Sequence, residues 1–111
     1  NSMYTKIKLT KHALAHGVVW THGIGTGLVS VNLTYAINFE VTFNLKCDQT
    51  LPRDRVAIVG SIPVLGDWDP EQCSFLETST ETYPNWTIIL SLPRDTLIEY
   101  KFIIVQHSHI I

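Results

Sequence analysis

The sequence predicts an all-β fold, an antiparallel sandwich or barrel, because a long alternating segment is followed by several short apolar runs with turn residues between them. Apolar side chains occupy every odd position of the alternating segment: Val29, Val31, Leu33, Tyr35, Ile37, Phe39, Val41, Phe43 and Leu45. Successive side chains of a strand point to opposite faces, so this period places the whole set on one side of a half-buried ribbon. Strands usually run about 3 to 10 residues. We therefore expect the ribbon to bend, bulge or split, with its later piece near Ile37 to Leu45.

Further strands are predicted downstream, at Arg55 to Gly60, Ser74 to Glu77, Thr87 to Leu92 and Ile98 to Val105. The residues between them are typical of turns, namely Gln49 to Asp54, Pro63 with Gly66-Asp67, Tyr83-Pro84-Asn85 and Pro93-Arg94-Asp95. Upstream, Gly23 to Gly27 is predicted to be a loop or hinge, and only the segment around His12 to His16 has a helical pattern. No role is assigned to residues 1–28.

Composition limits the classes of partner. The 111 residues, 45% of them hydrophobic, suit one domain with one core. With 8 Lys+Arg against 10 Asp+Glu, the net charge of -2 provides no broad positive field, so we expect neither nucleic acid nor a membrane surface as a partner. No run approaches the roughly 18 apolar residues of a membrane span, and no continuous apolar core of a secretory signal follows Lys6, Lys8 and Lys11. We expect part of a longer chain, and no cofactor. Cys47 and Cys73 allow either one disulfide or two thiols.

The segment from Val56 to Pro70, VAIVGSIPVLGDWDP, resembles the signature of the family 20 carbohydrate-binding modules, the starch-binding domains. The resemblance continues in the same order through Pro84-Asn85-Trp86 and through Leu92-Pro93 to Glu99-Tyr100-Lys101-Phe102-Ile103, and it covers about residues 39–104. It implies an antiparallel immunoglobulin-like β-sandwich over residues 29–111, incomplete because the family's last strands are missing. That loss leaves an unpaired edge unless residues before Phe39 cover it, and the ribbon from Val29 is our candidate.

The resemblance also implies binding residues. It places Trp68 in a first glucan site with Lys101 as a hydrogen-bond donor, and Trp86 in a second site, where Tyr83 is added by position alone. The chemistry agrees, since a glucose ring has C–H faces that suit a flat indole and an edge of hydroxyls that suits polar side chains. The chain lacks the tryptophan and asparagine that complete the family's first site, and Leu51 and Pro52 stand near the place of a second-site tyrosine.

The function that these features favour is non-catalytic binding of α-glucan, as starch, glycogen or maltooligosaccharide, by a module attached to a further domain. The alternative is a β-sandwich interaction or scaffold domain that has lost sugar binding, in which both tryptophans are packed and Lys101 is an ordinary solvated lysine. Two enzyme readings are weaker. A glycosidase would use the Asp67 and Asp69 carboxylates, and a metal enzyme would use His12 and His16 with the histidines at 22, 107 and 109.

Overall fold

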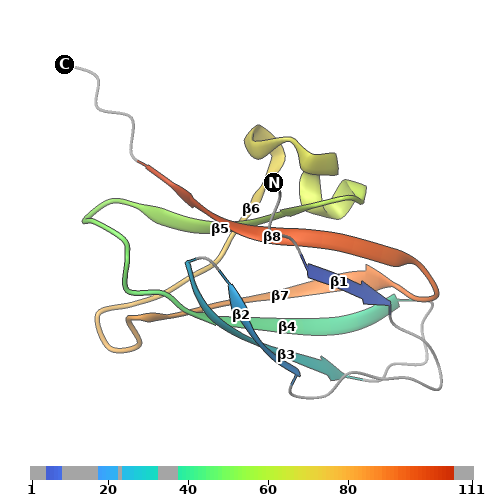
Figure 1. Ribbon diagram of the computed structural model, residues 1–111, viewed down its shortest axis with the longest axis horizontal. Helices are drawn as coiled ribbons and strands as arrows, with labels where there is room; N and C mark the ends of the chain where they lie inside the picture. The colour runs from blue at the N-terminus through green and yellow to red at the C-terminus, as the bar shows by residue number, and fades with distance from the viewer. Residues whose placement is uncertain (1–4, 9–17, 23, 33–37, 107–111) are drawn as a thin grey trace.

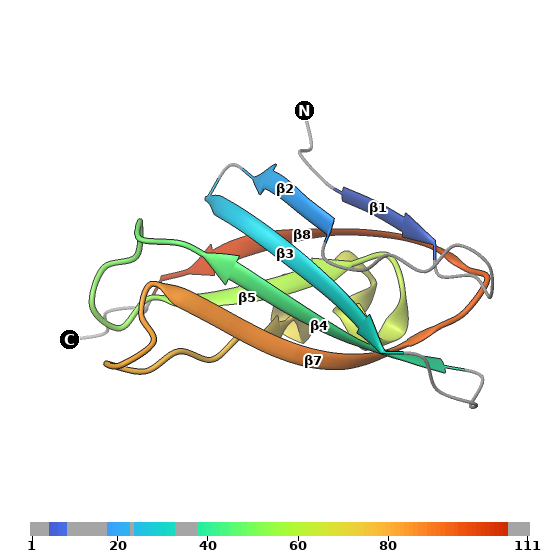
Figure 2. The same ribbon diagram turned by 90° about the horizontal axis from the view of Figure 1, so that it is seen from below.

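The structure, a computed structural model, describes residues 5–8, 18–22, 24–32 and 38–106. Two four-stranded sheets, with strand orders β1-β8-β5-β6 and β2-β3-β4-β7, pack face to face, and all neighbouring strands are antiparallel. The strands are β1 (Thr5–Lys8), β2 (Val18–His22), β3 (Gly25–Asn32), β4 (Asn38–Lys46), β5 (Arg55–Gly60), β6 (Ser74–Phe75), β7 (Asn85–Pro93) and β8 (Leu97–Val105). Figure 1 shows the two layers nearly edge-on, and Figure 2 shows the layer of β2, β3, β4 and β7 from its outer side. The expected antiparallel β-sandwich is confirmed.

The alternating ribbon splits into β3 and β4, which pair with each other in the register Val29↔Phe43 and Val31↔Val41. The odd positions of both strands face the core, where Val29, Val31, Phe39, Val41, Phe43 and Leu45 are all buried. The predicted single apolar face therefore holds for these residues. Strand β3 ends at Asn32 and β4 begins at Asn38, so the ribbon forms two strands, and the predicted positions Leu33, Tyr35 and Ile37 lie outside the described residues.

The downstream strands lie close to their predicted positions. Strand β5 has the predicted bounds, and β7 and β8 begin one or two residues earlier than expected. Strand β6 is shorter, because its pairing with β5 ends at Phe75 and Glu77 forms only an isolated bridge with Thr87 of β7. Two short 3-10 helices, η1 (Pro63–Trp68) and η2 (Pro70–Gln72), connect β5 to β6. In Figure 1 they lie outside the layer of β5 and β8, opposite the second sheet.

The prediction of a loop at Gly23 to Gly27 is wrong for its second half. Gly25 to Gly27 belong to β3, where Thr26 lies opposite Lys46 and Gly27 opposite Leu45. A Cβ atom at Gly25 would collide with the carbonyl of Lys46, so this glycine permits close pairing instead of breaking the strand. Strands β1 and β2 also lie within the segment left unassigned, and its boundary at residue 28 falls inside β3. The helical pattern around His12 to His16 lies outside the described residues.

Residues that precede Phe39 cover edges of both sheets. Strand β3 pairs along β4, as expected of the ribbon, and β2 adds a further strand outside it. The strand that pairs along β8 is β1, which the sequence pattern does not single out. Within the described parts of the chain, no helix is long and apolar enough to cross a lipid bilayer.

Candidate functional site

The loop between β5 and β6 presents Trp68 at the surface. Leu65 in η1 is fully buried and anchors the loop to the core. The next residues, Gly66, Asp67 and Trp68, have φ values of 82°, 51° and 67°. This left-handed stretch turns the chain back on itself, with the Asp69 amide donating to the Gly66 carbonyl at 2.9 Å. The result is a tryptophan residue that is 38% exposed on a loop fixed at its base.

Lys101 of β8 lies beside this indole. Its Nζ is 6.0 Å from the centroid of the Trp68 ring, within the range of a cation–π contact. Its neighbours Tyr100 and Phe102 point into the core, so Lys101 points to the outer face of its sheet, where the 61–73 loop lies. The structure thus brings together Trp68 and Lys101, which are 33 residues apart in the sequence. A flat apolar surface with a hydrogen-bond donor at its side suits the face and the edge of a sugar ring.

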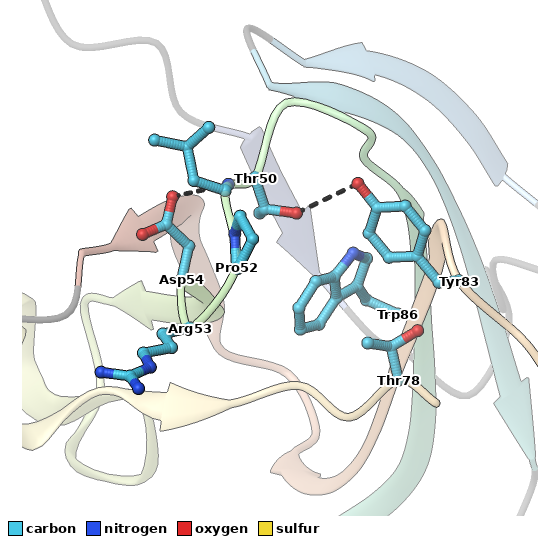
Figure 3. A pocket seen from close by; sticks show the side chains of 8 residues that line it. Thr50, Pro52, Arg53, Asp54, Thr78, Tyr83 and Trp86 are labelled. Carbon is cyan, nitrogen blue, oxygen red and sulfur yellow. Dashed lines mark hydrogen bonds between the residues drawn. The ribbon is translucent and has the colours of Figure 1, made fainter. Parts of the chain in front are cut away.

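A pocket of about 370 Å³ lies at the start of β7, between the 50–54 turn, Thr78, Tyr83 and Trp86. This volume is in the range of small-molecule sites, roughly 300–1,000 Å³. Figure 3 shows Thr50 and Tyr83 meeting through their hydroxyl groups, with the indole of Trp86 beside them. The distance between the Thr50 Oγ1 and the Tyr83 hydroxyl is 3.2 Å.

Tyr83 and Trp86 lie together in this pocket but contribute differently. Their ring centroids are 6.3 Å apart and the ring planes cross at 75°, an edge-to-face contact. Trp86 is only 6% exposed, and its Nε1 donates a hydrogen bond to the Cys47 carbonyl at 3.1 Å. Tyr83 is 44% exposed. Trp86 is therefore a wall of the pocket held in the core, and Tyr83 is the more exposed of the two aromatic residues.

Sequence reasoning missed two hydroxyl groups of this pocket, those of Thr50 and Thr78. Thr78 donates to the Asn85 carbonyl at 2.7 Å, and Thr50 contacts Tyr83. Neither lies in a motif. Thr50 approaches Tyr83 through the pairing of β4 with β7, and Thr78 approaches Trp86 through the bridge between Glu77 and Thr87, pairings that the sequence does not show. Leu51, which stands near the place of a family tyrosine, lines the same pocket and is 68% exposed.

The structure describes the two aspartates of the glycosidase hypothesis but not the side chains of the five histidines of the metal hypothesis. Asp67 and Asp69 are both exposed, and the Asp69 Oδ1 accepts a hydrogen bond from the Glu71 amide at 3.0 Å, which caps η2. No group of three or more metal-ligating side chains gathers among the residues that the structure describes. The histidines at 12, 16, 107 and 109 lie outside that part of the chain, and the side chain of His22 is not described. Cys47 and Cys73 are both free, and burial raises the pKa of the Cys73 thiol.

A model of the family described as the starch binding domain matches residues 38–111, from the start of β4 to the end of the chain. The chain belongs to this family. Strands β4 to β8, the Trp68 loop and the pocket at Trp86 all lie within the matched segment of the starch-binding domain, whereas β1, β2 and β3 precede it. No solved structure matched the chain.

Among curated proteins, this starch-binding domain is similar to parts of larger enzymes. It is 48% identical over 48 residues to an alpha-amylase of Thermomonospora curvata, a match that covers 43% of this chain and 8% of the relative. It is 40% identical over 77 residues to the AA13 family lytic polysaccharide monooxygenase A of Pyricularia oryzae, covering 68% and 20%. It is 33% identical over 63 residues to glucoamylase-1 of Schizophyllum commune, covering 57% and 10%. The matches thus span at most 20% of the length of these relatives.

Proposed function

We propose that this starch-binding domain holds α-glucan, as starch, glycogen or maltooligosaccharide, at the surface formed by Trp68 and Lys101. The observation that carries the proposal is that Trp68 is 38% exposed and that the Lys101 Nζ lies 6.0 Å from the centroid of its ring. The C–H face of a glucosyl residue stacks on the indole, and the Lys101 Nζ donates a hydrogen bond to a hydroxyl at the edge of that ring. This surface selects sugars by shape and hydrogen bonding, and the ligand needs no net charge to bind.

The pocket at Tyr83 and Trp86 is a second contact for the same polysaccharide. Tyr83 offers an exposed ring face, Trp86 closes the wall behind it, and Thr50 and Thr78 bring hydroxyl groups to the rim. A glucan chain is a repeating ligand, so two separate contacts on one domain hold it with a combined affinity greater than either alone.

The domain itself performs no chemistry in this proposal, and it serves as a module of a larger protein. Its relatives are enzymes of which the matched region is a small part, at most 20% of their length. The larger protein accordingly carries out its reaction on glucan in another domain, which the starch-binding domain keeps close to the polymer.

Affinity electrophoresis in gels that contain amylopectin tests the proposal. We expect the wild type to be retarded, and Trp68→Ala to bind about 1–3 kcal/mol more weakly, as is usual when a central aromatic contact is truncated. The matched control is Ile89→Ala, which removes a 61% exposed apolar side chain from the other sheet and leaves migration unchanged. Unretarded wild type would overturn the proposal and favour the interaction or scaffold domain instead.

A further inference from the structure

Strand β1 adds charged side chains to the sheet face that carries Lys101. It pairs antiparallel with β8, and the register sets Lys6 opposite Glu99 and Lys8 opposite Leu97. In β8, Ile98, Tyr100 and Phe102 are buried in the core. Because side chains alternate along a strand, Glu99 and Lys101 share the outer face.

Lys6 lies on that same face, because its Nζ is 3.9 Å from the Glu99 Oε2. Glu99 lies directly opposite Lys6, and Lys101 lies diagonally opposite Lys6. In an antiparallel pair, the backbone positions of such diagonal residues are about 7–8 Å apart. The Lys6 side chain is 59% exposed and that of Glu99 is 30% exposed, so both reach solvent. Lys101, Glu99 and Lys6 therefore follow one another across the sheet in a row of charged side chains, with Lys101 beside Trp68.

Hydrogen bonds link this row to the loop that carries Trp68. The Ser61 amide donates to the Glu99 carbonyl at 2.8 Å, and the Glu99 amide donates to the Ser61 hydroxyl at 3.0 Å. Ser61 lies two residues before the start of η1, so the segment that leads to Trp68 is hydrogen-bonded to the backbone of Glu99. The position of Glu99 relative to Trp68 is thereby set by backbone contacts and not by long side chains alone.

We propose that Lys6 and Glu99 form a further glucosyl subsite that extends the Trp68–Lys101 surface across β8 to β1, an inference that rests on the proposed function. The Glu99 carboxylate accepts hydrogen bonds from two adjacent hydroxyls of one glucosyl residue, and the Lys6 ammonium donates to a third oxygen. Both charged groups reach solvent beside the Trp68–Lys101 surface, so a bound oligosaccharide can contact them without displacing a buried side chain.

Chain length is the readout that separates this subsite from a structural role. Only an oligosaccharide that already covers Trp68 and reaches beyond it contacts Lys6 and Glu99. Calorimetric titration of the full chain with maltotriose and with maltoheptaose, in a Tyr83→Ala background that weakens the pocket, gives the ratio of the two affinities. We expect Lys6→Ala and Glu99→Gln each to lower maltoheptaose affinity about three- to tenfold and to leave maltotriose affinity within about twofold.

Lys8→Ala is the matched control, since Lys8 is an exposed lysine of the same short strand opposite the apolar Leu97. Thermal unfolding of every variant confirms that β1 stays paired, and Lys6→Met, which keeps an unbranched apolar stem and removes the ammonium donor, replaces Lys6→Ala if the latter unfolds early. Equal losses for both sugars, or no loss for either at Lys6 and Glu99, would overturn the subsite while binding by the wild type upholds the proposed function. Absence of wild-type binding to both sugars would overturn the proposed function itself.

Discussion

At the scale of single residues, the two tryptophans of the matched region differ in what surrounds their indole groups. Trp68 lies on a loop whose backbone turns it outward, and the residue is 38% exposed. Trp86 begins a strand at the pocket, and its Nε1 is satisfied by the Cys47 carbonyl inside the fold. A buried indole N–H that donates a hydrogen bond contributes to stability, because removing the indole leaves a buried carbonyl without its donor. Substitutions at these two positions should therefore change different measured quantities.

We predict that Trp86→Phe lowers the free energy of unfolding by about 1–3 kcal/mol, because it leaves the Cys47 carbonyl without its donor and a smaller ring in the core. Urea unfolding followed by circular dichroism measures this change. The control is Tyr83→Phe, which keeps the ring at the pocket, removes only the exposed contact with Thr50, and should change stability by less than about 0.5 kcal/mol. An unfolding midpoint for Trp86→Phe equal to that of wild type would contradict the structural role.

Tyr100 gives the domain a dependence on alkaline pH. Its side chain is fully buried, and burial raises the pKa of its hydroxyl above the ordinary value of 10.0. Below pH 10 the residue is neutral in both the native and the unfolded chain, so it contributes no pH dependence. Above pH 10 the unfolded chain loses a proton that the native state keeps, and the free energy of unfolding falls as pH rises.

We predict that the wild type loses about 1.4 kcal/mol more stability than Tyr100→Phe between pH 8 and pH 11, since one proton changes the free energy by that amount per pH unit. The substitution keeps the edge-to-face contacts of the ring with Phe43 and Phe102, whose centroids lie 5.1 Å and 5.8 Å away. Urea unfolding of both proteins at the two pH values gives the difference, and the remaining tyrosines and lysines are common to both. Parallel losses of stability would show that the hydroxyl ionises equally in both states.

At the scale of elements, the β5–β6 loop determines where Trp68 stands, and Gly66 is the residue on which its shape depends. Gly66 has a φ of 82°, and a Cβ there would lie 2.6 Å from the Gln72 carbonyl oxygen. Residues other than glycine rarely adopt this backbone region. The clashing carbonyl is part of the backbone of the same loop, so it cannot move aside as a side chain could. A larger residue must therefore move the end of η1 and η2 apart.

We predict that Gly66→Ala lowers the free energy of unfolding by about 1–3 kcal/mol and also weakens retardation in amylopectin gels, because Trp68 moves with the displaced loop. Glu71→Ala is the control in the same loop, since the Glu71 side chain is exposed and only its backbone amide contacts Asp69. Normal stability together with normal retardation of Gly66→Ala would show that the loop shape does not set the binding surface.

The elements that sequence alone predicts are those whose pattern is local. The period of two from Val29 to Leu45 indicates a buried face, and β5 follows from a short apolar run between turn residues. Glycine has two opposite meanings, however: at Gly66 it permits a left-handed turn, whereas at Gly25 it permits close strand pairing. Composition cannot distinguish these cases, which is why a loop was expected where β3 begins.

The candidate site also has one part that the sequence predicts and one part that depends on long-range contacts. The resemblance to the family predicts both Trp68 and Lys101 as site residues. Their contact depends on the β5–β6 loop lying over β8, an arrangement that the resemblance also implies. The exposure of Trp86 depends on which carbonyl its Nε1 reaches, 39 residues away, and Thr50 meets Tyr83 only through the pairing of β4 with β7. Such long-range contacts leave no periodic trace in the sequence.

At the scale of the whole molecule, the sandwich includes strands that precede the segment matched by the family. Val29 and Val31 of β3 are each 1% exposed and belong to the same core cluster as Phe43 and Tyr100. Ile7 of β1 packs against that cluster from the other sheet. A fragment limited to residues 38–111 would expose this core and leave β4 and β8 with unpaired edges, which favours aggregation.

We therefore predict that the fragment 38–111 is aggregated or lacks a cooperative unfolding transition, whereas the full chain is monomeric and unfolds in one step. A longer fragment, residues 18–111, keeps β2 and β3 and, of the described strands, loses β1, so it should fold with a lower midpoint than the full chain. Size-exclusion chromatography and thermal unfolding of the three proteins measure the series. If 38–111 unfolded cooperatively at the midpoint of the full chain, β1 to β3 would lie outside the cooperative unit, and the domain would begin at β4 in spite of the buried valines.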